Sequence, residues 1–242
     1  SIANAFGYSD EELGSIPAES NMGLSCGNPL AIASIREGEV VVDLGSGGGL
    51  DVFLAARQVG PTGRAIGIDM TGDMISLARA NARKGNYDNV SFHLAEIEAM
   101  PIPSRSVDCV ISNCVLNLCE DKDAALAEVF RILKPGGRLA ISDIALRKEL
   151  PAHVAQEMSA WTGCIGGALT IEDNREKLLR AGFTEVVIQD AQADLNAYRA
   201  GGAAACCGPS TSCCGPSDEP QEANFHDQMS ALLDTIDANE YA

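Results

Sequence analysis

The sequence has a deficit of positive charge, which narrows the range of its partners. Among 242 residues there are 17 lysines and arginines against 34 aspartates and glutamates, so the formal net charge at pH 7 is −17. A surface of that sign repels phosphate backbones and anionic lipid. We therefore expect neither nucleic acid nor a membrane surface as a partner.

Long apolar runs and a secretory leader are also missing from the sequence. No stretch approaches the roughly 20 apolar residues that span a bilayer, and the first residues show no signal-peptide pattern. We therefore expect a cytoplasmic protein. The chain also lacks internal repeats, and its three histidines, His93, His153 and His226, lie in no recognisable catalytic setting.

What the sequence has in excess is cysteine, on an otherwise ordinary soluble composition. Hydrophobic residues make up 46% and charged residues 21%, and a chain of this length can bury a large core in one or two domains. Nine cysteines, an odd number spread through α/β sequence, do not resemble a secreted disulfide framework. In a reducing compartment, surplus thiols favour metal binding or thiol chemistry.

Short β-branched runs alternate with helical patterns between about residues 40 and 145, which is typical of a parallel sheet built by right-handed crossovers. The expected strands are residues 40–44, 64–69, 90–93, 107–112 and 138–143. The expected helices are residues 50–58, 73–85 and 122–133, the last of them ended by Lys134-Pro135-Gly136-Gly137. The pattern predicts an α/β fold with a mostly parallel sheet.

The pattern is looser after Leu150. We expect a helix over residues 151–161, a glycine turn over 163–167, a helix over 171–181 and a strand over 185–188. Residues 201–220 are mostly Gly, Ala, Ser, Pro and Cys and cannot fold alone, whereas Phe225 to Ile236 show helical spacing. The predicted division is a domain over 1–150, a small α+β extension over 151–200 and a flexible cysteine-rich tail with a short helix over 201–242.

A glycine-rich turn follows the first expected strand. Its residues, Gly45-Ser46-Gly47-Gly48-Gly49, would let the backbone approach a ligand where Cβ atoms would clash. Asp69, 20 residues after Gly49, can accept both hydroxyls of a ribose. Such a turn also suits a dinucleotide, but Asp43 would repel a pyrophosphate and can instead hold the amino-acid end of a zwitterion. These carboxylates favour S-adenosylmethionine.

The series from Val40 to Asp143, including S-N-C after the fourth strand and L-K-P-G-G-R-L before the fifth, resembles the class I methyltransferases, which have a Rossmann-like fold. The resemblance implies a role for twelve residues at the cofactor. Asp43, Gly45, Ser46, Gly47 and Gly49 would surround the methionine end, Asp69 and Met70 the ribose, Ile97 and Glu98 the adenine, and Asn113, Cys114 and Leu116 the pocket floor.

The methyl acceptor is a separate question. Oxygen and nitrogen acceptors usually need a base that takes a proton, whereas an acceptor with a ready lone pair, such as trivalent arsenic held by thiolates, needs none. The sequence resembles the arsenite methyltransferases of the microbial type over nearly all of residues 20–170. The matching stretches are N-M-G-L-S-C-G-N-P at 21–29, D-L-G-S-G-G-G-L-D-V at 43–52, G-I-D-M-T at 67–71, E-I-E-A-M-P at 96–101, S-N-C-V-L-N-L at 112–118 and W-T-G-C-I-G-G-A-L at 161–169.

This second resemblance implies that Cys26 and Cys164 form the arsenic site and carry the chemistry. Soft thiolates suit soft As(III). The pair would accept arsenite or its glutathione conjugate, hold the arsenic toward the methyl group and form a disulfide as the chemistry oxidises them. A thiol reductant such as glutathione or thioredoxin would then restore them.

The remaining cysteines match the family less well. Family members commonly carry a cysteine upstream of the stretch seen here, and the third arsenic-binding cysteine of the larger relatives has no residue-by-residue match. The doublets Cys206-Cys207 and Cys213-Cys214 could capture arsenite and deliver it, or could belong to a tail without a catalytic part, and they do not match a zinc ribbon. Cys109 is expected in the core, and Cys119 has no assigned role. The Cys114 thiol is expected to be incidental.

Two other functions stay open from the sequence. One is a methyltransferase that acts on an organic small molecule such as a quinone precursor, for which Cys26 and Cys164 would be dispensable. The other is a thiol-rich protein that sequesters arsenic or heavy metals without methyl transfer, which the intact D-L-G-S-G-G-G turn argues against.

Overall fold

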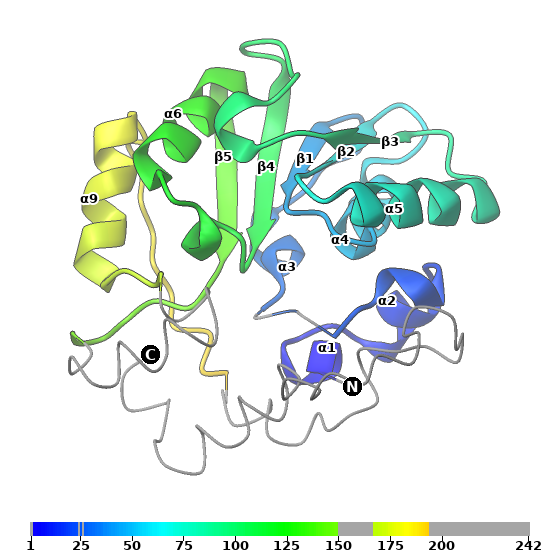
Figure 1. Ribbon diagram of the computed structural model, residues 1–242, viewed down its shortest axis with the longest axis horizontal. Helices are drawn as coiled ribbons and strands as arrows, with labels where there is room; N and C mark the ends of the chain where they lie inside the picture. Colours follow the sequence, from blue (N-terminus) through cyan, green and yellow to red (C-terminus); the bar gives the residue numbers. More distant parts are fainter. Residues whose placement is uncertain (1, 24, 26, 150–166, 194–242) are drawn as a thin grey trace, which may run out of the picture.

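The computed structural model describes residues 2–23, 25, 27–149 and 167–193. Within them, one parallel sheet of order β3-β2-β1-β4-β5 forms the centre of the fold (Figure 1). Its strands are β1 (Val40–Leu44), β2 (Arg64–Asp69), β3 (Val90–Leu94), β4 (Val107–Asn113) and β5 (Leu133–Ser142). The predicted Rossmann-like α/β class is confirmed. The predicted extension and tail lie largely outside the described residues, and the three-part division stays a prediction.

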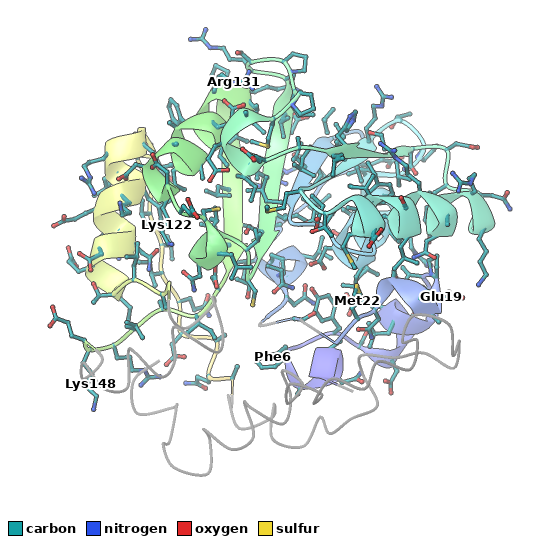
Figure 2. The ribbon with its side chains drawn as sticks, viewed as in Figure 1. Phe6, Glu19, Met22, Lys122, Arg131 and Lys148 are labelled. Atoms are coloured by element: carbon teal, nitrogen blue, oxygen red, sulfur yellow. The ribbon has the colours of Figure 1, made fainter. Side chains whose placement is uncertain are left out.

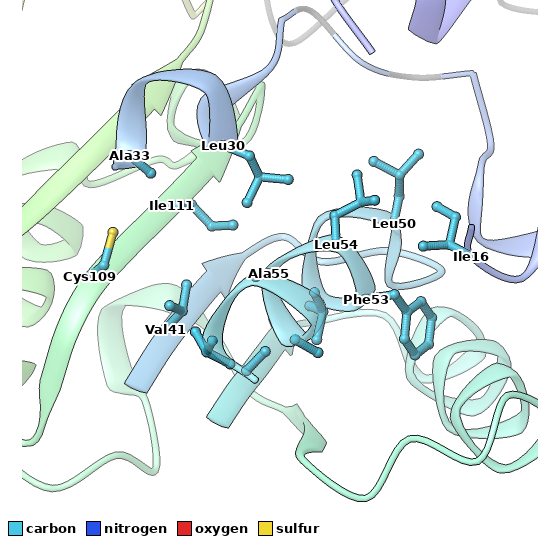
Figure 3. Packing of buried hydrophobic residues seen from close by; sticks show 14 of the residues in the cluster. Ile16, Leu30, Ala33, Val41, Leu50, Phe53, Leu54, Ala55, Cys109 and Ile111 are labelled. Atoms are coloured by element: carbon cyan, nitrogen blue, oxygen red, sulfur yellow. The ribbon is translucent and has the colours of Figure 1, made fainter. Parts of the chain in front are cut away.

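Two layers of helices cover the sheet, because the side chains of a strand point alternately to its two faces. Val41 joins an apolar cluster under α3 (Pro29–Ala33), α4 (Leu50–Val59) and α5 (Gly72–Lys84). Val42 joins a second cluster under α6 (Lys122–Ile132), against which α9 (Ile171–Ala181) packs. Figure 3 shows part of the first cluster, where Leu50, Phe53 and Leu54 of α4 lie beside the sheet.

Short elements connect the strands to these helices at the edge where the site lies. They are η2 (Ile97–Ala99) after β3 and η3 (Leu116–Leu118) after β4. The two elements contact α6, so they belong to the same face of the sheet as that helix.

The N-terminal segment, for which the sequence patterns predict no helix or strand, forms α1 (Ile2–Ala5), α2 (Asp10–Gly14) and η1 (Ala18–Ser20) ahead of α3. Ser9 and Glu12 form a capping box at the start of α2. Tyr8 and Ile16 are buried in the same cluster as α4, which seats this segment against the domain (Figure 3). A salt bridge of 2.5 Å joins Glu19 to Lys84 of α5, and Figure 2 labels Glu19 in this segment.

Two sequence predictions within the described residues need correction. Residues 185–188 form no strand: Val187 is 88% exposed, and Arg175 of α9 donates to the carbonyl oxygen of Val186 in place of a neighbouring strand. The last strand also begins at Leu133 rather than Arg138, because Leu133 pairs with Val107 and a register shift accommodates the Lys134–Gly137 turn. The helix expected at 151–161 and most of the turn at 163–167 lie outside the described residues.

A matched pair of substitutions tests the assignment of the core. Val110 of β4 is fully buried, whereas Val187 is 88% exposed. We expect Val110→Ala to lower the free energy of unfolding by roughly 2–3 kcal/mol, because it removes two buried methyl groups and leaves a cavity. The same change at Val187 should stay within about 0.5 kcal/mol of the parent. Urea unfolding of both variants measures the difference, and equal losses would contradict the assigned core.

Candidate functional site

The candidate site lies where β1 and β4, adjacent in the sheet, reach their carboxyl ends. The chain leaves β1 through α4 on one face and leaves β4 through η3 and α6 on the other. Ligands of open α/β sheets bind in the crevice that this divergence creates. The glycine turn after β1 and the S-N-C stretch after β4 therefore meet at one place, as the sequence predicts.

The glycine turn has the backbone shape of a ligand cradle. Gly45 and Gly49 have φ values of +66° and +96°, and a Cβ on either would lie within 2.7 Å of a neighbouring side chain. Gly47, with φ +50°, is different, because a Cβ there would have no protein atom within 4 Å. The chain folds around an open side at Gly47, so a ligand can approach the backbone at this residue.

Asp69 at the end of β2 holds this turn in place. Its carboxylate accepts hydrogen bonds from the backbone nitrogens of Gly47 at 2.9 Å and Thr71 at 2.8 Å. A carboxylate has further lone pairs, so the predicted contact with ribose hydroxyls remains compatible with this geometry. The structure adds a second task for Asp69, which is to fix the cradle itself.

Two buried carboxylates, Asp43 in β1 and Asp51 in α4, have raised pKa values that no lysine or arginine among the described residues offsets. Burial raises the pKa of Asp43 well above its ordinary value, and the negative charges of Asp51 and Asp69 raise it further. Burial also raises the pKa of Asp51 to about 6, although hydrogen bonds from Tyr8 and Asn113 oppose this shift. A buried pair of this kind is costly unless a positive group compensates it. The ammonium and sulfonium of S-adenosylmethionine supply such a group.

Two buried serine hydroxyls also indicate a polar ligand at this place. Ser46 Oγ, in the glycine turn, and Ser112 Oγ, near the end of β4, are buried and find no hydrogen-bond partner in the part of the chain that the structure describes. Buried polar atoms normally have partners. With the open side at Gly47, the orphaned Ser46 hydroxyl indicates that the cradle fits a polar ligand such as the methionine end of the cofactor.

The other residues predicted at the cofactor differ in how accessible they are. Met70 is 74% exposed just beyond β2 and can contact a ligand. Ile97 and Leu116 are buried in the second apolar cluster, and Glu98 is half-buried. Their contacts with ribose, adenine or the pocket floor stay predictions.

Asn113 at the end of β4 has protein partners that the sequence did not reveal. Its Nδ2 donates to the Tyr8 hydroxyl and to the Gly27 carbonyl, both at 2.9 Å, and lies 3.3 Å from Asp51 Oδ2. Tyr8 in turn donates to Asp51 Oδ1 at 2.6 Å. Sequence reasoning missed Tyr8 and Asp51, although Asp51 stands within the quoted D-L-G-S-G-G-G-L-D-V stretch.

The cysteines predicted at the acceptor site, Cys26 and Cys164, lie outside the described residues, as do the Cys206-Cys207 and Cys213-Cys214 doublets. Among the described cysteines, Cys109 and Cys119 are free thiols, and burial raises the pKa of each to about 11. Both are therefore protonated near neutral pH and are weak ligands for a thiophilic ion. Cys114 is disulfide-bonded, so its sulfur is not a free thiol, and the expectation that it is incidental to the function stays a prediction.

The described residues contain no metal-binding cluster and no membrane-spanning helix. No group of three or more His, Cys, Asp or Glu side chains there could hold a metal ion. No helix in the same ranges has the length and apolarity needed to cross a membrane.

Comparisons with known proteins agree with this geometry. A family model described as a methyltransferase domain matches residues 35–193. The chain belongs to the methyltransferase family. The family and its cradle imply S-adenosylmethionine as the cofactor of this methyltransferase domain, as the sequence predicts.

Two curated relatives and one solved structure illustrate what this methyltransferase is similar to. The arsenite methyltransferase of Halobacterium salinarum is 44% identical over 204 residues, which cover 79% of this chain and 52% of the relative. The human arsenite methyltransferase is 38% identical over 153 residues, 60% of this chain and 40% of the relative. A crystal structure of an arsenic(III) S-adenosylmethionine methyltransferase from Chlamydomonas reinhardtii matches with a TM-score of 0.62 and 34% identity, covering 76% of this chain and 62% of that one.

The chain spans about half the length of the curated relatives that it matches most extensively. The resemblance to arsenite methyltransferases found in the sequence is confirmed at the level of the family.

A matched pair of glycine substitutions tests the cradle. Gly47 and Gly136 both have positive φ and open space around a Cβ, but only Gly47 lies in the turn. Each change to alanine should cost about 1 kcal/mol of stability through backbone strain. Only Gly47→Ala should also weaken S-adenosylmethionine binding, by at least about tenfold, as measured by isothermal titration calorimetry. Equal affinities in the two variants would contradict the placement of the ligand.

The raised carboxyl pKa values predict that cofactor binding releases protons. Near pH 6, Asp51 is about half protonated because burial raises its pKa to about 6. A cation placed beside the pair favours the charged form, lowers the pKa and expels the proton. Calorimetric titrations in buffers of different ionisation enthalpy should show net proton release at pH 6, where the Asp51 carboxyl is partly protonated. Proton uptake on binding, or no buffer dependence at pH 6, would contradict the proposed pairing.

Proposed function

We propose that this protein transfers the methyl group of S-adenosylmethionine to trivalent arsenic held by thiolates. The observation that supports the proposal most directly is the hydrogen bond that holds the Gly27 backbone. Its carbonyl accepts from Asn113 at the end of β4, so the backbone of Gly27, the second residue of the C-G-N-P stretch, is held at the end of that strand. The resemblance to arsenite methyltransferases supports arsenic as the element that this stretch presents.

The reaction proposed at this site needs no base. S-adenosylmethionine supplies an electrophilic methyl carbon, and the arsenic lone pair forms the As–C bond as the S–C bond breaks and S-adenosylhomocysteine leaves. The arsenic gives up two electrons in this step. Two thiols return two electrons to it and become a disulfide, and a thiol reductant then restores the thiols. In this scheme, carboxylates would bind the methyl donor and cysteines would hold the methyl acceptor.

The roles of the chain's own residues follow from their environment. Asp43 and Asp51 would bind the cationic part of the donor, and the Asp69-braced glycine turn would orient its methionine end. Cys26 and Cys164 would hold arsenite or its glutathione conjugate so that the arsenic lies in line with the methyl group at about 3–3.5 Å. Cys206 and Cys207 are proposed as residues that could deliver arsenite.

The proposed enzyme can be tested by arsenic speciation. We expect the reduced protein, incubated with arsenite, S-adenosylmethionine and glutathione, to form methylated arsenicals that mass spectrometry detects. Cys26→Ser and Cys164→Ser should each lower the rate by at least about a hundredfold, because each removes an arsenic ligand. Cys119→Ser is the matched control, since Cys119 is a free thiol without an assigned role, and it should keep the parental rate.

The outcomes separate the proposed function from its alternatives. Without methylated arsenic from the parent protein, the proposed function fails. Methylation of a quinone precursor in that case would favour the organic acceptor, and stoichiometric arsenite binding without cofactor binding would favour sequestration. Full activity in both cysteine variants would keep the enzyme but remove the proposed site. Replacing glutathione with thioredoxin in the same assay tests the choice of reductant.

A further inference from the structure

The Asn113 amide is the centre of a polar network that no sequence motif indicates. An amide nitrogen carries two hydrogens, and its two shorter contacts, both 2.9 Å, go to the Tyr8 hydroxyl and the Gly27 carbonyl. The contact with Asp51 Oδ2 is longer, at 3.3 Å. The Asn113 side chain therefore links the N-terminal segment to the end of β4.

Tyr8 completes the link to α4. Its hydroxyl donates to Asp51 Oδ1 at 2.6 Å, and its side chain is only 2% exposed. Burial and the adjacent Asp51 charge raise the pKa of Tyr8, so the hydroxyl keeps the proton that it donates. The hydrogen bonds run in one direction, from Asn113 to Tyr8 to Asp51.

Gly27 is held by shape as well as by its hydrogen bond. A Cβ on Gly27 would collide with the Ser142 side chain at the end of β5. Its neighbour Asn28 caps α3 and donates to the Gly7 carbonyl at 3.1 Å. The backbone at Gly27 is thus fixed against β4, β5 and the N-terminal segment together.

We propose that Tyr8, Asp51 and Asn113 are positioning residues that fix the chain at Gly27 and thereby set where the thiol of the preceding residue, Cys26, meets the methyl donor. Gly27 is the covalent neighbour of Cys26, and consecutive Cα atoms lie 3.8 Å apart, which is why the proposal links the anchoring of Gly27 to the position of that thiol. The proposal rests on the proposed function, because it takes Cys26 as an arsenic ligand. None of the three residues touches the arsenic in this scheme.

The same N-terminal segment has other polar anchors that do not reach Gly27. Arg57 donates to the Ser15 carbonyl at 3.0 Å, and the Tyr87 hydroxyl lies 3.5 Å from the same oxygen. If the network served only to hold the segment down, losing either kind of anchor would have the same consequence. Tyr87→Phe is therefore the matched control for Tyr8→Phe, since each variant loses one hydroxyl and keeps its ring.

The test compares the two variants at pH 8, where Asp51 is ionised. Tyr8→Phe should lower kcat for arsenite methylation by about tenfold, because small displacements of a reacting group have large effects on rate. Tyr8→Phe should also weaken S-adenosylmethionine binding, because Tyr8 donates to Asp51, so kcat is measured at saturating S-adenosylmethionine. Tyr87→Phe should change neither quantity. In an Asn113→Ala background, Tyr8→Phe should add little further loss, because both act through Gly27.

A second readout does not depend on arsenic chemistry. It is the rate at which iodoacetamide alkylates Cys26 in the reduced, cofactor-free protein, followed by mass spectrometry of the Cys26 peptide. This rate should change at least about threefold in Tyr8→Phe and should not change in Tyr87→Phe. An unchanged kcat in Tyr8→Phe would overturn the positioning role. If the parent protein does not methylate arsenite, the proposed function fails and alkylation alone decides: equal rates in the three proteins would overturn the network's role.

Discussion

The site depends on the parallel pairing of β1 with β4 in the middle of the sheet. Leu44 lies beside Ser112 across this pair, so the turn after β1 and the loop after β4 start from the same edge. Because the following helices pass to opposite faces, the crevice between the loops is not filled by either helix. The buried charge of Asp43 and Asp51 is gathered at this one point, where a cationic ligand can compensate it.

The N-terminal segment turns this crevice into a site with two sides. Ser20 packs against Gly48, where a Cβ would come within 3.3 Å of the Ser20 backbone, and Tyr8 and Gly27 reach the end of β4 through Asn113. The donor side is built by the glycine turn and the carboxylates. In the proposed function, the acceptor side would include Cys26, which directly precedes Gly27 in the sequence.

Much of the sheet was predictable because its strands and crossover helices are local patterns. The boundaries of β1 and β2 match the expectation, and each end of α5 lies within one residue of it. The glycine turn and Asp69 could also be predicted from the sequence, because the motif fixes the spacing between them. The capping box of Ser9 and Glu12 is a local sequence signal for the start of α2.

The rest could not be predicted because it depends on contacts between distant residues. Tyr8 and Asp51 are 43 positions apart, and Tyr8 and Asn113 are 105 apart, so no local pattern pairs them. The expected strand at 185–188 failed for the same reason, because an apolar run forms a strand only where a neighbour is free to pair with it. Val187 is left 88% exposed instead.

The central claim is that donor and acceptor meet at the ends of β1 and β4. A crystal structure of the reduced protein with S-adenosylhomocysteine and phenylarsenite, with arsenic located by its anomalous scattering, tests it most directly. The account predicts arsenic bonded to the Cys26 sulfur beside Asn113, facing the cofactor sulfur over the glycine turn. Arsenic bound only to the cysteines at 206–214, or a cofactor bound away from the Gly45–Gly49 turn, would contradict the account.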